Sequence, residues 1–370
     1  MSVTTLSLPS SPALSPSPAL AQPLARAPVD PRDRGGPAQP LLSVSGLVKH
    51  FPVRKGSGPK QVVRAVDGVD FETLKGETLG IVGESGCGKS TTAKLLMGLI
   101  ERDSGDLLFD GEAVGTRALP WRAYRRHVQM VFQDSYASLN PRMTVEASIA
   151  FGPKVNGVPG RQAVERARAL LARVGLEPKR FAARYPHELS GGQRQRVNIA
   201  RALALEPRLV LLDEAVSALD KSVEAQVLNL LLDLKAEFGL TYIFISHDLN
   251  VVRFISDRVM VMYLGRVAEI GPSDTVLAEP AHPYAHALLH AMPSLDPDNR
   301  TQEALLAGDP PNPIDPPSGC RFHPRCRLVA PVCSGKEPPL DAVGPAHRAA
   351  CLARQPGSGH PDAPSVQAAA

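Results

Sequence analysis

The sequence has 370 residues, 36 of them proline, and a formal net charge of +4 at pH 7. This length allows about two domains, each large enough to bury a core of its own. Basic and acidic residues are interspersed, which argues against a nucleic-acid-binding protein, and no apolar run approaches the ~20 residues of a membrane-spanning helix. We therefore expect a protein that binds no nucleic acid and that works at a membrane only by docking to it.

The two ends of the chain differ in composition from its centre. Residues 1–40 contain nine prolines among Ser, Ala and Leu, and residues 356–370 are similar. Neither segment shows an alternating or helical apolar period, so both are predicted to be disordered tails. The first residues also lack a basic segment followed by an apolar run, so no secretory signal is predicted and a cytosolic protein is expected.

Strand-like and helix-like patterns alternate between the tails. The runs at 209–213 and 241–245 are apolar nearly throughout, as in parallel strands that are covered on both faces. The helical pattern between them indicates a βαβ crossover, so the core is predicted to be α/β, with a helical insertion at about 136–188. The predicted strands are 41–51, 62–71, 78–82, 128–132, 209–213 and 241–245, with a hairpin at 259–269; the clearest helices are 89–100, 163–174 and 223–238.

A glycine-rich turn lies between a predicted strand and a predicted helix and fits the pattern Gly-x-x-x-x-Gly-Lys-Ser. Glycines at these positions let backbone N–H groups curl around phosphates, the lysine adds a positive charge, and the serine hydroxyl can ligate Mg²⁺. A thiol at a helix start tends to have a lowered pKa, but Cys87 is expected chiefly to fill a position that needs a small residue. The predicted nucleotide contacts of this loop are Gly83, Glu84, Ser85, Gly86, Cys87, Gly88, Lys89, Ser90 and Thr91.

Two acidic residues and a second glycine-led helix complete the predicted chemistry. Asp213 is placed at a strand end to hold Mg²⁺, and Glu214 to polarise the water that attacks the phosphate. The stretch Leu-Ser-Gly-Gly-Gln, residues 189–193, begins a helix whose N-terminus is suited to bind phosphate. The sequence therefore predicts two phosphate-binding helix starts in one chain.

Over residues 41–272 these motifs resemble those of the ATP-binding subunits of ABC transporters. The resemblance implies an ABC-type P-loop NTPase core, in which a RecA-like sheet is joined by an antiparallel β subdomain and a helical subdomain, and it implies ATP and Mg²⁺ as cofactors. The residues that carry it, in the order typical of the family, are the phosphate loop, Gln133, the signature 189–193, Asp213 and Glu214, the turn 217–220, and His247.

The resemblance also implies roles for single residues. Gln133 is expected to contact the metal or the water and to report the nucleotide state to a membrane subunit, and His247 to contact the γ-phosphate and hold Glu214. Phe51 resembles the aromatic residue that stacks on adenine, with a strand-end core aromatic as the alternative. Two subunits of this family meet head to tail, so each ATP lies between two chains. The nucleotide-binding residues implied outside the phosphate loop are Phe51, Ser190, Gly191, Gly192, Gln193 and Asp220.

Four of the five cysteines lie in one short, proline-rich segment near the carboxyl end. Disulfides are not expected in a reducing cytosol, and four thiols in a segment with little core of its own favour a structural metal site. The spacing differs from the paired Cys-x-x-Cys of common zinc sites, and both Zn²⁺ and an iron–sulfur cluster suit four thiolates. The four residues are Cys320, Cys326, Cys333 and Cys351.

The segment 273–355 resembles the carboxyl-terminal extension of the ATPases of dipeptide and oligopeptide importers. The resemblance rests on the His-Pro-Tyr sequence at 282–284 and on Gly-Cys-Arg-Phe-x-x-Arg-Cys at 319–326. In this family the four cysteines can hold a [4Fe-4S] cluster, which we expect here in preference to Zn²⁺.

The combined resemblance predicts the ATP-hydrolysing subunit of a bacterial dipeptide or oligopeptide importer, at the cytoplasmic face of the inner membrane. Its implied partners are a second ABC ATPase, expected to be a different chain, two integral membrane permeases and, indirectly, an extracytoplasmic substrate-binding protein. Two alternatives stay open: import of nickel or another small solute by the same kind of complex and, with less support, a soluble ABC ATPase that transports nothing.

Overall fold

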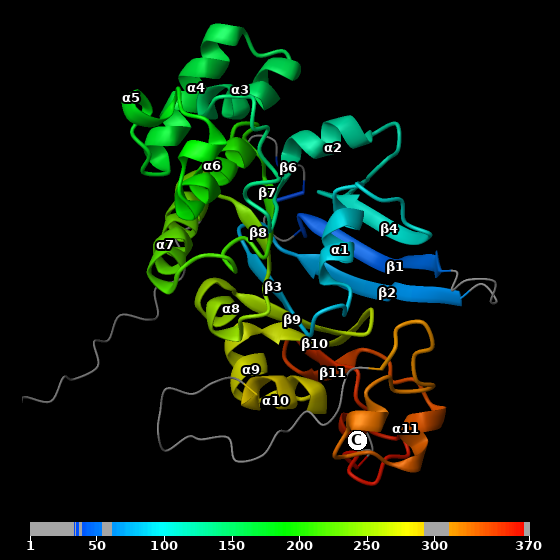
Figure 1. Ribbon diagram of the computed structural model, residues 1–370. Coiled ribbons are helices and arrows are strands. Elements are labelled where there is room, and N and C mark those ends of the chain that lie inside the picture. The colour runs from blue at the N-terminus through cyan, green and yellow to red at the C-terminus, as the bar shows by residue number, and fades with distance from the viewer. Residues whose placement is uncertain (1–32, 34, 37–38, 54–60, 292–310, 366–370) are drawn as a thin grey trace, which may run out of the picture.

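The structure is a computed structural model that describes residues 33, 35–36, 39–53, 61–291 and 311–365 (Figure 1). Most of the predicted amino-terminal tail lies outside these residues. Among the described residues, no helix is both long enough and apolar enough to cross a membrane.

A four-stranded antiparallel sheet forms one layer, with the strand order β2-β1-β4-β5. Alternate residues of its first strand, such as Leu42 and Val44, are buried, because one face of the sheet packs on the core. The strands are β1 (Leu42–Val53), β2 (Gln61–Thr73), β4 (Ser104–Phe109) and β5 (Glu112–Ala113).

The second sheet has eight strands in the order β11-β12-β10-β9-β3-β8-β7-β6. Its central strands are parallel and wholly buried, which explains their nearly continuous apolar sequences. Leu209 and Leu211 face the core shared with the four-stranded sheet, whereas Val210 and Leu212 face the core shared with the helices. The strands are β3 (Thr78–Val82), β6 (Val128–Val131), β7 (Leu209–Asp213), β8 (Thr241–Ile245), β9 (Arg258–Tyr263) and β10 (Arg266–Pro272).

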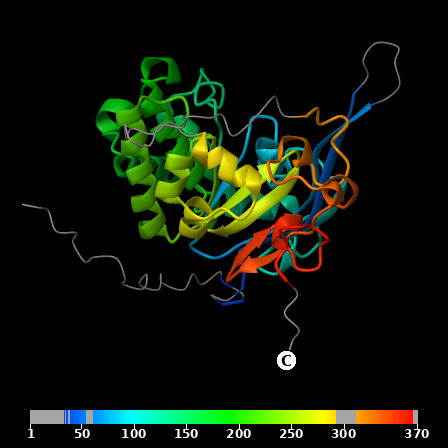
Figure 2. The same cartoon turned by 90° about the horizontal axis from the view of Figure 1, so that it is seen from below.

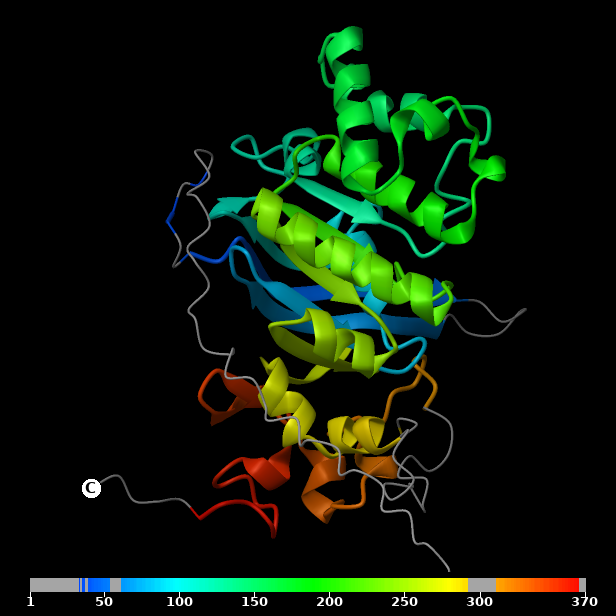
Figure 3. The same ribbon diagram turned by 90° about the vertical axis from the view of Figure 1, so that its left-hand side faces the viewer.

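Helices cover the large sheet and form a separate group at one end. Figure 3 shows α7 lying across one face of the sheet, with the helical group α3 to α6 beyond it. In α4 the buried residues Ala163, Ala167, Leu170 and Leu171 recur at helical spacing and face the core. The bounds are α1 (Lys89–Leu96), α2 (Trp121–His127), α3 (Val145–Val155), α4 (Gly160–Arg173), α5 (Pro178–Phe181), η1 (Pro186–Glu188), α6 (Gly191–Leu203), α7 (Lys221–Phe238) and α8 (Leu249–Ile255).

The carboxyl-terminal extension continues the large sheet, a connection that the sequence analysis did not predict. Strand β12 pairs antiparallel with β10, and β11 pairs with β12, so the extension adds two strands to the core (Figure 2). The fully buried carboxylate of Glu269 on β10 accepts hydrogen bonds from the backbone N–H groups of Ala281 and His282 and lies 2.7 Å from Nε2 of His347. The remaining bounds are α9 (Ser273–Ala278), α10 (Pro283–His290), η2 (His323–Arg325), α11 (Pro331–Gly335), β11 (Asp341–Gly344), β12 (His347–Ala349) and η3 (Leu352–Arg354).

The start of the predicted carboxyl-terminal tail differs from the expectation of disorder. Ser358 and His360 are buried, and the ring of His360 lies 2.7 Å from the carbonyl oxygen of Leu328. The sequence of this segment shows no apolar period, because a serine and a histidine hold it to the extension through hydrogen bonds.

Candidate nucleotide site

The predicted site residues follow four strands of the large sheet. The phosphate loop follows β3, Gln133 follows β6, Asp213 and Glu214 end and follow β7, and His247 follows β8. Because these strands are parallel and adjacent, their carboxyl ends lie at one edge of the sheet, where α/β proteins bind ligands. The topology therefore places all four groups at the same edge.

The phosphate loop depends on glycine at two positions. Gly83 has a φ of +148°, and a Cβ atom there would lie 2.2 Å from the carbonyl oxygen of Met262. Gly88 has a φ of +109°, and its Cβ atom would lie 2.3 Å from the carbonyl oxygen of Ala65. A side chain at either position would collide with fixed backbone, so the tight turn of this loop requires glycine.

The loop curls around its own lysine. Nζ of Lys89 is buried and donates hydrogen bonds to the carbonyl oxygens of Gly83 and Glu84, at 2.7 Å and 2.9 Å. A phosphate bound here would therefore meet both the ammonium group and the backbone N–H groups at the start of α1. Ser85 and Gly86 are exposed at the mouth of the loop, and Thr91 is half-buried behind it.

One serine and one aspartate suit a magnesium ion. Oγ of Ser90 donates a hydrogen bond to Oδ1 of Asp213 at 3.0 Å, so a hydroxyl oxygen and a carboxylate oxygen face each other. Burial raises the pKa of Asp213, and the nearby charge of Glu214 raises it further. A cation would stabilise the ionised carboxylate, and hard oxygen ligands are what Mg²⁺ prefers, so these residues fit the ion that the fold family implies.

Glu214 lies beside His247, its predicted partner, and also beside Gln133, which was expected to contact the metal or the water. Nε2 of Gln133 donates a hydrogen bond to Oε2 of Glu214 at 2.7 Å, and Nδ1 of His247 lies 3.6 Å from the same oxygen. Glu214 also has a φ of +47°, a left-handed conformation that non-glycine residues rarely adopt and that is frequent at functional sites. No feature of the sequence signals this backbone conformation.

The signature 189–193 forms the predicted helix start. Ser190 is the N-cap of α6: its Oγ accepts a hydrogen bond from the N–H of Gln193, whose side chain accepts one from the N–H of Ser190. This capping box leaves the N–H groups of Gly191 and Gly192 at the positive end of the helix. In the described part of the chain, no hydrogen bond or ion pair joins 189–193 to the phosphate loop.

Two further predicted residues lie at the surface. The ring of Phe51 is 38% exposed, so it is not the core aromatic of the alternative interpretation. Nζ of Lys49 lies 5.5 Å from the centre of this ring. Asp220 is the N-cap residue of α7 and is exposed, although its side chain makes no capping hydrogen bond.

Cys87 is buried, as expected of a small residue that fills space, and the tendency toward a low thiol pKa at a helix start is not seen. The side chain is 3% exposed, and burial raises the pKa of its thiol although the charge of Lys89 lowers it. The effect of desolvation on the pKa outweighs that of the helix N-terminus, because the sulfur lies in the core rather than in solvent. Cys87 therefore fills a small buried space in the loop.

The four cysteines of the extension line one small cavity together with His282, His323 and His360. None forms a disulfide, and burial raises the pKa of Cys320 and of Cys326 to about 11 and that of Cys351 in the same direction. Among the described residues, no group of three or more His, Cys, Asp or Glu side chains is arranged to hold a metal ion. The structure thus brings the predicted ligands to one cavity without forming a metal site.

His282 gives the extension a pH dependence that can be measured. Burial lowers the pKa of His282 from 6.5 to about 4, and its Nδ1 accepts the N–H of Tyr284 as the N-cap of α10. Because the folded pKa lies below the unfolded one, this stabilisation is complete above pH 6.5 and is lost as the pH falls toward 4. The free energy of unfolding should fall by up to about 3 kcal/mol in that range, measured by urea unfolding.

The His282→Asn variant is the matched control for this titration. Asparagine retains an acceptor for the N-cap hydrogen bond but does not titrate. Its stability should therefore depend less on pH between 6.5 and 4 than that of the unsubstituted protein. Equal pH dependence of the two proteins would assign the acid sensitivity to other groups.

Comparisons with known proteins agree with this geometry. Residues 66–217 match the family model described as ABC transporter, and residues 268–333 match the model described as Oligopeptide/dipeptide transporter, C-terminal region. The chain is similar in structure to cbiO1 from Clostridium perfringens, part of the ABC transporter complex cbiONQ, with a TM-score of 0.56 and 31% identity over 65% of this chain and 91% of that one. It is also similar to the ATP-binding cassette MJ0796 bound to ADP and Pi, with a TM-score of 0.54 and 29% identity over 63% of this chain and 98% of that one.

Curated relatives extend the similarity over most of the chain. It is 51% identical over 333 residues to a probable peptide ABC transporter ATP-binding protein of Sinorhizobium fredii, covering 89% of this chain and 94% of the relative. It is 48% identical over 330 residues to the oligopeptide transport ATP-binding protein OppF of Escherichia coli, covering 85% of this chain and 97% of the relative. The predicted family and ABC-type fold are confirmed. The chain belongs to the ABC transporter family, as an ATP-binding and ATP-hydrolysing subunit whose carboxyl-terminal region is that of the oligopeptide and dipeptide transporters.

Proposed function

We propose that this subunit powers peptide import by closing head to tail with a second ATPase subunit around ATP. The observation that supports the proposal is a second phosphate-binding helix start: α6 begins at the signature with Ser190 as its N-cap, in addition to α1, which begins at the phosphate loop. A helix N-terminus with free N–H groups attracts the γ-phosphate of a nucleotide held by another chain. Hydrolysis removes that phosphate and would loosen the pair.

The residues at the carboxyl ends of the strands supply the chemistry of this proposal. Lys89 and the loop would bind the phosphates, Ser90 and Asp213 would hold Mg²⁺, and Glu214 would accept a proton from the attacking water. Gln133 and His247 orient the Glu214 carboxylate, which the distances above support. When bound, Mg²⁺ would supply positive charge that stabilises the negative charge of the phosphate groups.

The substrate class and the partners come from the relatives. The Sinorhizobium fredii and Escherichia coli proteins are named as peptide and oligopeptide transport proteins, so we assign peptides to this subunit too. Its partners would be a second, different ATPase subunit, two membrane permeases and, through them, an extracytoplasmic binding protein. The subunit would lie peripherally on the cytoplasmic face of the inner membrane.

Reconstitution tests this function directly. The subunit, co-expressed with its partner ATPase and permeases and placed in vesicles with the binding protein, should drive ATP-dependent uptake of a labelled dipeptide or oligopeptide. Uptake of nickel in place of peptides would correct the substrate class. Failure to co-purify with any integral membrane protein would contradict the importer itself.

An exposed apolar surface on the helical group suits a permease. Phe151 and Val155 on α3 are each 55% exposed and lie one turn apart, and Tyr136, three residues after Gln133, is 51% exposed. Exposed apolar side chains grouped on one element mark an interaction site. We therefore assign this surface as the docking site for an apolar helix in a cytoplasmic loop of the permease. Tyr136 places the surface close in sequence to Gln133.

The Phe151→Asp variant should lose this docking. A buried apolar anchor is typically worth more than about 2 kcal/mol in an interface, so co-purification with the permease should fall at least tenfold, whereas ATP binding by the isolated subunit should not change. Phe254→Asp on α8 is the control, because Phe254 is equally exposed at 55%. If both variants co-purify equally, α3 is not the docking surface.

We also propose that the cysteine cavity holds a [4Fe-4S] cluster. Four free thiols from different stretches of the extension line one cavity, which supports the proposal, although the described side chains are not arranged around an ion. The raised pKa values of Cys320, Cys326 and Cys351 mean that a bound cation is needed to keep these three as thiolates. When bound, the cluster would link the short elements of the extension, which have little apolar core between them.

Metal analysis decides the identity of this group. Protein purified without oxygen should be brown and contain about four irons per chain. One zinc and no colour would establish the alternative, and protein without either metal would contradict the site. Cys333→Ser should lose the metal, whereas Cys87→Ser, outside the cavity, should retain it.

A further inference from the structure

The carboxyl-terminal extension holds the phosphate loop at Glu84. The hydroxyl oxygen of Tyr284 on α10 accepts a hydrogen bond from the backbone N–H of Glu84 at 2.8 Å. The guanidinium of Arg325 donates two hydrogen bonds to the Glu84 carboxylate, at 2.9 Å and 3.0 Å. The backbone carbonyl oxygen of Glu84 also accepts a hydrogen bond from Nζ of Lys89. Glu84 therefore connects the extension to the phosphate-binding lysine.

These contacts are shielded from water. The side chain of Arg325 is 6% exposed and that of Glu84 22% exposed, and Tyr284 is fully buried. The ring of Tyr284 packs against those of Tyr263 and Phe322, with ring centres 4.5 Å and 5.4 Å apart. A two-bond arginine–carboxylate pair in such surroundings is stronger and more directional than an exposed ion pair.

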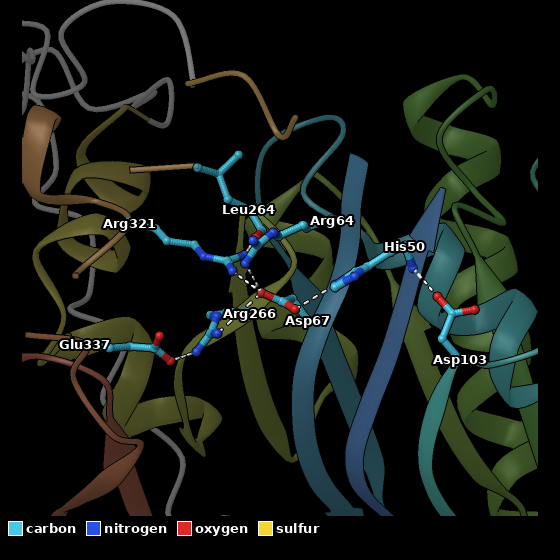
Figure 4. A network of polar contacts seen from close by, with 8 residues as sticks. All are labelled: His50, Arg64, Asp67, Asp103, Leu264, Arg266, Arg321 and Glu337. Atoms are coloured by element: carbon cyan, nitrogen blue, oxygen red, sulfur yellow. Dashed lines mark hydrogen bonds and ion pairs between the residues drawn. The ribbon is translucent and has the colours of Figure 1, made fainter. Parts of the chain in front are cut away.

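A second arginine of the same segment reaches the strands that carry Phe51. Arg321 donates hydrogen bonds to the carboxylate of Asp67 on β2 and to the carbonyl oxygen of Leu264 (Figure 4). Asp67 in turn lies 2.7 Å from Nε2 of His50, the residue before Phe51. Burial raises the pKa of Asp67, but hydrogen bonds from His50 and Arg321 lower it to about 2, so the carboxylate is ionised and paired.

We propose that the segment 320–326 positions the nucleotide at both of its ends. Arg325, together with Tyr284, fixes the phosphate loop through Glu84, and Arg321 fixes the strand pair that carries Phe51. These are positioning residues, since each acts through another residue. The proposal concerns nucleotide binding, so its test is independent of which solute is transported.

The direction of the effect follows from preorganisation. A loop already held in its binding conformation loses less conformational entropy when the phosphates bind. Without the Arg325 pair, the side chain of Glu84 would lose its anchor, and the backbone that Lys89 contacts would be held less firmly. Loss of the contact should therefore weaken nucleotide binding.

The experiment measures binding of Mg·ATP and of Mg·tripolyphosphate to the full chain by displacement of a fluorescent ATP analogue. Arg325→Gln and Tyr284→Phe should each weaken both ligands about tenfold, because both lack a hydrogen bond to the loop. Arg321→Gln should weaken binding of Mg·ATP but not of Mg·tripolyphosphate, because Arg321 supports the strands whose Phe51 would contact the adenine base. In hydrolysis assays, the Arg325 effect should appear in KM, with turnover at saturating ATP retained.

Matched variants separate positioning from general damage. Tyr284→Phe retains the ring packing and removes one hydroxyl, so it should fold, and Arg325→Lys should restore part of the affinity. Glu84→Gln combined with Arg325→Gln should cost no more than either change alone. Arg354→Gln, whose side chain bonds to the carbonyl of Ala281 within the extension, should bind both ligands normally. Unchanged affinity in Arg325→Gln and Tyr284→Phe, or an equal loss in Arg354→Gln, would overturn the proposal.

Discussion

Replacing Glu214 by glutamine is expected to stop most ATP hydrolysis while ATP binding is retained. The amide has the size of the carboxylate and can still contact Gln133, but it cannot accept a proton from water. Proton transfer to a positioned base contributes a factor of about 10² to 10⁴ to the rate, so the turnover number should fall by that amount. Phosphate release measures turnover, and nucleotide displacement measures binding. The ATP-bound pair of subunits should also persist and elute as the larger species in gel filtration.

Glu206→Gln is the matched control for this experiment. Glu206 also has a left-handed backbone, with a φ of +53°, but its carboxylate pairs with Arg166 outside the site. The control should therefore hydrolyse ATP at the normal rate. Normal turnover by the Glu214 variant would assign the base to another residue.

The core of the fold was predictable because its strands are buried on both faces. Residues 209–213 and 241–245 have apolar sequences that few other structures allow, and the structure places β7 and β8 at these positions. The predicted helix 89–100 instead ends at Leu96, because Gly98 has a left-handed φ of +61° that leaves the helix. Short elements such as β4, with six residues, and β12, with three, were missed, since so few residues carry too little periodicity.

The candidate site residues can be recognised from the sequence where they lie close together. The phosphate loop and the acids after β7 are local patterns with a direct chemical reason. The contact of Arg325 with Glu84 spans 241 residues, and no local pattern reports it. The same holds for the pairing of β12 with β10, which depends on the chain returning to the edge of the sheet. The left-handed backbone of Glu214 also arises from the turn after β7. In this turn the carbonyl oxygen of Glu214 accepts a hydrogen bond from Oγ of Ser217, and its N–H donates one to the carbonyl oxygen of Ile245.

Lys89→Ala should have the opposite outcome to the Glu214 variant, with binding itself lost. The Lys89 ammonium is buried and is the charge that lies inside the phosphate loop, held by the carbonyl oxygens of Gly83 and Glu84. Hydrogen bonds to charged groups contribute about 1.5–3 kcal/mol, so the affinity for Mg·ATP should fall by at least about tenfold and as much as a hundredfold.

Lys94→Ala provides the control for this substitution, because Lys94 lies on the same helix, α1, but is exposed. It should bind Mg·ATP almost normally in the same displacement assay. The difference between Lys89→Ala and Glu214→Gln then separates two functions at this edge of the sheet: binding of the phosphates and activation of the water that attacks them. If Lys89→Ala bound Mg·ATP with unchanged affinity, the turn after β3 would not be the phosphate site, and the chemistry assigned to Ser90, Asp213 and Glu214 would lose its substrate.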